Sequence, residues 1–183
     1  GNTAANLLTG GNGADTLAGG GGIDTLNGGA GADLLSGGGG ADAFVLNVLG
    51  PGADTVTDFA SGSDQMRIGQ AAIRVGDGDT VVEGATTIAA PGGFSRDAEL
   101  VIVTSNLAGG ISASAAAAAI GAATSAYATG AQRLFVVDDG SSSALFLFTS
   151  SSANAVVSAA ELTLLAALTG TAATSAGDFA FIA

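Results

Sequence analysis

Large apolar residues recur every nine positions near the start of this chain. From Gly10 to Val45, four units follow one another without a gap: GGNGADTLA, GGGGIDTLN, GGAGADLLS and GGGGADAFV. The sixth position of every unit is Asp, and the eighth is always apolar: Leu17, Leu26, Leu35 and Phe44. A strict repeat predicts stacked copies of one structural unit, in which neighbours bury the apolar face that one copy leaves exposed.

Each unit reads as a tight turn followed by a very short strand. Glycine in the first half allows positive φ angles, and the last three residues, such as those at 16–18, place one side chain on one face. Two units then form one coil of a flattened roll, and units two apart stack as parallel strands. This stacking places Leu26 beneath Phe44 in one sheet and Leu17 beneath Leu35 in the other.

Degenerate units flank the regular block. Residues 1–9, GNTAANLLT, keep the period but carry Asn6 in place of Asp. After an insertion at 46–48, the phase resumes with LGPGADTVT and FASGSDQMR, which contain Asp54 and Asp64. The repeat ends at Ile68, so the sequence predicts a roll domain over residues 1–68.

Residues 69–183 predict a second domain, β-rich with two short helices, so that the whole chain is mainly β. Alternating apolar residues predict a hairpin of strands 72–75 and 80–83 around the Asp-Gly turn of 76–79, where an additional cation site is the alternative. The other predicted elements are a buried strand (99–104), a hairpin (134–137 with 145–148), a final strand (177–183) and helices at 112–127 and 159–168.

The predicted helix at 159–168 begins with a capping box, Ser158-x-x-Glu161. Residues 150–161 also have the outline of an EF-hand loop, with Glu161 at its twelfth place. Serine stands where that loop needs its first acids, and Ala155 stands where it needs glycine. The capping box is therefore the preferred interpretation.

Composition excludes several function classes. The chain carries 16 acidic residues and a net charge of −12, which disfavours binding to nucleic acid or to an anionic membrane. Residues 105–132 are uncharged, but their Ala, Ser, Thr and Gly are too weakly apolar for a spanning helix. Because the chain has no Cys and no His, thiolate and imidazole metal sites and the usual catalytic triads are excluded. No pair of acids stands out for acid–base catalysis, so we expect no enzymatic activity.

The candidate chemistry is calcium binding by the turns. A roll with so much glycine and so thin a core needs another source of folding energy. Stacked turns bring Asp carboxylates together, and carboxylates with main-chain carbonyls are the oxygen ligands that Ca²⁺ prefers. The predicted pairs are Asp15 with Asp33 and Asp24 with Asp42. Asp33 with Asp54 and Asp42 with Asp64 are candidates for further sites. Asp58 fits equally as a ligand or as a strand-edge charge. The predicted carbonyl ligands come from the second and fourth positions: Gly11, Gly13, Gly20, Gly22, Gly29, Gly31, Gly38 and Gly40.

The repeat G-G-x-G-x-D-x-U-x resembles the RTX (repeats-in-toxin, hemolysin-type) calcium-binding nonapeptide. Residues 54–68, DTVTDFASGSDQMRI, resemble the segment that closes the roll in serralysin-type proteases. The resemblance implies a type I secretion substrate of a Gram-negative bacterium, secreted or held at the cell surface. It also implies an export signal, at about 155–183, that an ABC transporter reads. An ordinary closing strand is the alternative for the last seven residues.

Two functional classes follow from this resemblance. The chain, which opens inside a repeat, is expected to be the C-terminal piece of a longer protein. That protein is either a surface-layer or adhesin-like structural protein, which self-associates in a lattice, or a secreted hydrolase such as a metalloprotease or lipase. The Ala-, Thr- and Ser-rich C-terminal half favours the structural class. Residues preceding Gly1 would decide between them.

Overall fold

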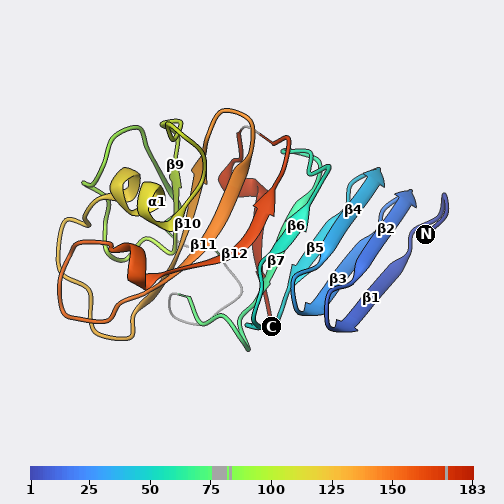
Figure 1. Ribbon diagram of the computed structural model, residues 1–183, viewed down its shortest axis with the longest axis horizontal. Coiled ribbons are helices and arrows are strands. Elements are labelled where there is room, and N and C mark those ends of the chain that lie inside the picture. Colours follow the sequence, from blue (N-terminus) through green and yellow to red (C-terminus); the bar gives the residue numbers. More distant parts are fainter. Residues whose placement is uncertain (76–81, 83, 172) are drawn as a thin grey trace.

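Two β-sheets form the framework of the computed structural model, which describes residues 1–75, 82, 84–171 and 173–183 (Figure 1). The first sheet has the order β1-β3-β5-β7-β13, with β1 Leu7–Asn12, β3 Thr25–Ala30, β5 Ala43–Leu46, β7 Gln65–Gly69 and β13 Phe179–Ile182. The second has the order β2-β4-β6-β12-β11-β10-β9-β8, with β2 Thr16–Gly21, β4 Leu34–Gly39, β6 Asp54–Val56, β12 Leu162–Leu168, β11 Ser143–Thr149, β10 Gln132–Asp138, β9 Leu100–Val103 and β8 Thr86–Ile88. The fold is mainly β, as predicted.

The N-terminal strands alternate between the two sheets and form the predicted parallel roll. Leu26 aligns with Phe44 in the first sheet, and Leu17 aligns with Leu35 in the second, which confirms the predicted stacking. Each column continues past the regular units, from Phe44 to Met66 in one sheet and from Leu35 to Val56 in the other. Eighth-position side chains therefore line the space between the sheets.

The end of the chain returns to the roll. Strand β12 runs parallel to β6, and β13 runs parallel to β7, so the C-terminus lies beside the closing segment (Figure 1). Phe179 and Phe181 belong to the same core cluster as Leu26 and Phe44. Both sheets thus continue across the predicted boundary at Ile68.

The remaining strands enclose a second core. The hairpin predicted at 134–137 with 145–148 is present as β10–β11, where Leu134 aligns with Leu147. Strand β9 is buried and lies parallel to β10. Phe135 contacts Phe94 and Phe148 at centroid distances of 5.5 and 5.9 Å. Residues 76–81 and 83 of the predicted hairpin lie outside the described residues, and its first predicted strand, 72–75, is a turn and loop instead. None of the described helices is long and apolar enough to cross a membrane.

Helix α1, Ala113–Ile120, is shorter than the predicted 112–127. It begins as expected, because the Ser112 hydroxyl accepts a hydrogen bond from the amide of Ala115 at 3.2 Å. It ends at Gly121, whose φ of 76° is outside the helical range. The residues that follow leave the helix to form β-bridges, one between Ala122 and Val156.

The helix predicted over 159–168 is wrong. Its capping box is present, since the amide and hydroxyl of Ser158 donate to Glu161 Oε2 at 3.1 and 2.7 Å. Only one 3-10 turn follows, Ala159–Glu161, and the next seven residues form β12. These residues lie between β6 and β11, so strand pairing on both sides overrides the local helix signal. A second 3-10 turn, Ala176–Asp178, precedes β13.

Glu161 fastens the loop at 150–161 through hydrogen bonds. Its other oxygen, Oε1, accepts bonds from the amide and the hydroxyl of Ser151, both at 2.7 Å. Burial opposes the negative charge, but the four donors on Ser151 and Ser158 outweigh it and lower the pKa of Glu161 to about 2. The carboxylate is therefore bound by main-chain and hydroxyl donors at both oxygens.

The stacked column predicts a large effect of Phe44→Ala. Phe44 is fully buried between Leu26 and Met66, so truncation leaves a cavity and should lower the free energy of unfolding by about 3–5 kcal/mol. Leu7→Ala is the control, because Leu7 is 78 % exposed in the same sheet and its loss should cost under about 0.5 kcal/mol. Urea unfolding in calcium measures both; equal losses would contradict the column.

Candidate metal centre

The predicted aspartates lie in turns that stack along the two edges of the roll. One edge carries Asp15, Asp33 and Asp54, and the other carries Asn6, Asp24, Asp42 and Asp64. Each turn binds the next through a hydrogen bond from a main-chain amide to the Oδ1 atom of the next acid. The bonds are Asp15 to Asp33 (2.8 Å), Asp33 to Asp54 (3.1 Å), Asn6 to Asp24 (2.7 Å), Asp24 to Asp42 (2.8 Å) and Asp42 to Asp64 (2.9 Å). The structure therefore brings every predicted pair together.

The second carboxylate oxygen of the regular units differs from the first in its hydrogen bonding. Asp24 is fully buried, and Asp33 and Asp42 are each 2 % exposed. Among the described residues, no group donates to the buried Oδ2 atoms of Asp15, Asp24, Asp33 and Asp42. A buried anionic oxygen without a partner is strongly destabilising. A cation at these oxygens would remove the penalty.

The first glycine of each unit lets the acid of its own turn lie close against the main chain. A Cβ atom built on Gly10 would lie 2.6 Å from Asp15 Oδ2 and 2.5 Å from the carbonyl oxygen of Gly28. At Gly19 it would overlap Asp24 Oδ2 and lie 2.5 Å from the carbonyl oxygen of Gly37. At these two glycines, a carboxylate from one turn and a carbonyl from the next therefore lie close to each other, so that both oxygens can reach one cation between the turns. The flexible oxygen coordination of Ca²⁺ fits this arrangement.

These first-position glycines were missing from the predicted ligand set. The signal was present, because Gly10, Gly19, Gly28 and Gly37 open all four units. Their φ angles are not positive, so turn geometry does not require glycine at these positions. The close approach of the carboxylate does require it, since a side chain on Gly28 or Gly37 would also overlap the acid of its own turn.

The predicted second- and fourth-position glycines have a different requirement. All eight have φ angles between 93° and 143°. A Cβ on Gly29 or Gly31 would overlap the carbonyl oxygen of Gly11 or Gly13, and Gly38 and Gly40 stand over Gly20 and Gly22 in the same way. The carbonyls at these positions therefore point along the stack toward the following turn, which brings oxygen donors between the turns.

Electrostatics also favours a cation. Burial raises the pKa of Asp42, the Asp24 amide lowers it, and the charges of Asp64, Asp24 and Asp58 raise it further. Burial likewise raises the pKa of Asp54 to about 6, although the Asp33 amide opposes the rise. Among the described residues, no three His, Cys, Asp or Glu side chains gather as a metal cluster. Main-chain carbonyls must therefore complete the coordination, as suits Ca²⁺ and not zinc.

Two further acids are fully hydrogen-bonded. The Oδ1 atom of Asp64 binds the Asp42 amide, and its Oδ2 atom accepts from the amide of Ala60 at 2.9 Å. Asp58 accepts from the hydroxyl of Ser36 at 2.7 Å and from the amides of Gly37 and Gly38 at 3.0 and 2.9 Å. Asp58 thus lies over the turn of the fourth unit and binds its main chain.

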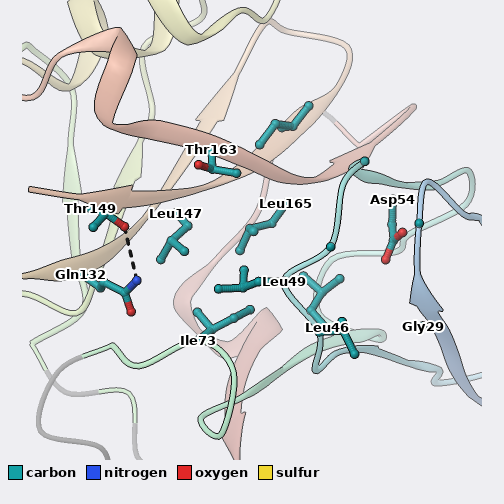
Figure 2. Close-up of a pocket in the computed structure, with 15 residues that line it drawn as sticks. Gly29, Leu46, Leu49, Asp54, Ile73, Gln132, Leu147, Thr149, Thr163 and Leu165 are labelled. Atoms are coloured by element: carbon teal, nitrogen blue, oxygen red, sulfur yellow. Dashed lines mark hydrogen bonds between the residues drawn. The ribbon is translucent and has the colours of Figure 1, made fainter. Parts of the chain in front are cut away.

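A cavity of about 270 Å³ lies beside residues 50–52, next to the insertion at 46–48. Figure 2 shows Leu49 among Leu46, Ile73, Leu147 and Leu165, with Asp54 toward the roll. At the far side, Gln132 donates to the hydroxyl of Thr149 at 3.3 Å. The cavity adjoins the edge that carries Asp15 and Asp33, and its lining combines apolar side chains with glycine main chain and the polar side chains of Asp54, Gln132, Thr149 and Thr163.

A family model, the RTX calcium-binding nonapeptide repeat in four copies, matches residues 1–44. Residues 1–44 are RTX repeats. The match begins at the degenerate first unit, in which Asn6 replaces the acid. RTX repeats bind calcium, and the donorless oxygens of the stacked turns fit that ion. No curated protein and no solved structure matches the chain significantly.

Calcium removal should unfold the RTX roll. Without the ion, the donorless carboxylate oxygens and their mutual repulsion oppose stacking, so binding energy is folding energy. In a chelator, far-ultraviolet circular dichroism should lose the β signal of residues 1–68; millimolar Ca²⁺ should restore it, and equimolar Mg²⁺ should not. An unchanged spectrum in chelator would contradict the role of calcium in folding.

A side chain at a first-position glycine should weaken one site. In Gly19→Ala, the new methyl group overlaps Asp24 Oδ2 and lies 2.5 Å from the Gly37 carbonyl, so it displaces these oxygens, and calorimetry should find lower calcium stoichiometry. Gly39→Ala is the matched control, because its φ is not positive and its Cβ would meet no atom within 4 Å. Equal calcium binding by the two variants would exclude Asp24 Oδ2 and the Gly37 carbonyl as ligands.

Proposed function

We propose that this chain is the calcium-folded C-terminal module of a secreted or cell-surface structural protein. It carries an RTX roll that folds outside the cell and, at about 155–183, the segment that a type I ABC transporter reads. The observation that carries the proposal is the row of buried, donorless Asp oxygens in the stacked turns. A chain with this requirement stays unfolded at the low calcium level of a cytosol and folds at the higher level outside.

A structural role is favoured over an enzymatic one. The chain has no His, no Cys and only four basic residues, and the predicted calcium ligands account for the stacked acids. With a net charge of −12, copies of the module repel one another unless cations screen or bridge them. Self-association in a surface lattice would therefore also depend on calcium.

The second candidate is the export module of a secreted hydrolase, either a metalloprotease or a lipase. One observation favours it, the closing segment at 54–68 that resembles the serralysin type. In this structure the segment forms β6 and β7. Between these two strands in the sequence, Asp58 accepts hydrogen bonds from the hydroxyl of Ser36 and the amide of Gly37. The catalytic residues would then lie in another part of the protein.

The test of export follows the chain in cells that carry a type I apparatus. Deleting residues 158–183 should abolish its appearance in the medium, measured by fractionation of cells and medium. The deletion also removes β12 and β13, so a control must separate a lost signal from a lost fold. Phe44→Ala serves that purpose, because it weakens the roll and keeps the tail, and it should still be exported. A truncated chain in the medium at the normal level would overturn the assignment of the tail.

A further inference from the structure

The last two strands form one more coil of the roll. Strands β6 and β7 are followed in space by β12 and β13, in parallel and in register. Leu168 aligns with Val56, and Phe179 aligns with Met66, so both core columns gain one more side chain. Residues 162–182 thus repeat the path of the closing segment, about a hundred positions further along the chain.

The pair of hydrogen bonds that follows β6 is repeated after β12. The amide and hydroxyl of Thr57 both donate to the carbonyl of Leu35, at 3.0 and 3.3 Å. One coil further on, the amide and hydroxyl of Thr169 donate to the carbonyl of Val56 in the same way, at 2.9 and 3.2 Å. The Thr171 hydroxyl adds a bond of 2.6 Å to the carbonyl of Phe59.

A carboxylate fastens each of these coils to the turn beneath it. Asp58 binds the Ser36 hydroxyl and the amides that follow it. Asp178 binds the Ser61 hydroxyl at 2.6 Å and the Gly62 amide at 2.8 Å, and its own loop contributes the Ser175 amide at 2.7 Å. Asp178 is only 1 % exposed, so these donors replace its water.

Both fastening acids precede a buried aromatic residue. Phe59 follows Asp58, and Phe179 follows Asp178; each phenylalanine is 4 % exposed and belongs to the roll core. An Asp-Phe pair therefore fixes the chain to the roll twice, once within the closing segment and once at the end of the chain.

We propose that the edge of β7, with Ser61 and Gly62, is the docking site of the C-terminal strand, and that calcium-driven folding withdraws this strand from the exporter. The inference rests on the proposed function for the identity of the tail's other partner. Main-chain bonds to β7 can form only where the roll has already assembled. The tail is thus free in the calcium-poor chain and bound in the folded one. By linkage, docking of the tail also strengthens calcium binding.

Access to the C-terminus measures docking without any export assay. A serine carboxypeptidase, which needs no metal, should digest the tail of the full chain rapidly in chelator and slowly in millimolar Ca²⁺. In calcium, Asp178→Asn should raise the digestion rate by about tenfold or more, because it weakens charge-assisted bonds in a buried site. The calcium concentration that gives half-maximal protection of the tail should also be higher in this variant. Asp97→Asn is the control, since that side chain is 80 % exposed and should change neither value.

A milder variant covers the case in which Asp178→Asn prevents folding. Ser61→Ala removes one donor and leaves the Gly62 amide, so it should give a smaller increase in tail digestion with the β signal retained. Equal digestion of the wild-type tail with and without calcium would overturn the proposal, as would Asp178→Asn and Ser61→Ala tails that stay fully protected. If calcium protects the tail but a chain lacking 158–183 is still exported, the assigned export function fails while docking stands.

Discussion

The hydrogen bond from the main chain of one turn to the carboxylate of the next is the interaction on which this structure depends. It takes one oxygen of each stacked acid, as at Asp15 with Asp33 and Asp24 with Asp42, and it sets the turns directly over one another. The other oxygen is then buried without a donor. The geometry that aligns the sheets therefore also creates the demand for calcium.

The stacking of the turns also explains where the repeat needs glycine. Second and fourth positions need glycine for a positive φ, whereas the first position needs it because the acid lies against the main chain. The acids that close the roll are held by protein donors instead. Asp64 has amide donors on both oxygens, and Asp58 and Asp178 bind serine hydroxyls and amides. The roll thus passes from acids with a donorless oxygen to acids that protein donors hold.

The sequence predicted the roll well because its signals are local. The nine-residue period placed Leu26 under Phe44 and paired the acids of stacked turns, since both follow from adjacent units. The C-terminal half was harder to predict. At 159–168 the capping box is real, yet the residues become a strand because β6, a hundred positions earlier, offers an edge. The end of α1 likewise involves distant residues, because Ala122 pairs with Val156 directly after it. The requirement for glycine at Gly10 was missed for a different reason: it comes from the close approach of Asp15 and not from a positive φ.

The return of the chain end to the roll has a kinetic consequence. Regular coils join residues 18 apart, whereas the last coil joins residues 112 and 113 apart. Loop-closure entropy makes that step less favourable by about 1.5 kcal/mol relative to a regular coil. Contacts of such high sequence separation form slowly. The repeats can therefore assemble early, unit by unit, while the core is completed only when residues 162–182 reach the closing segment at 54–68.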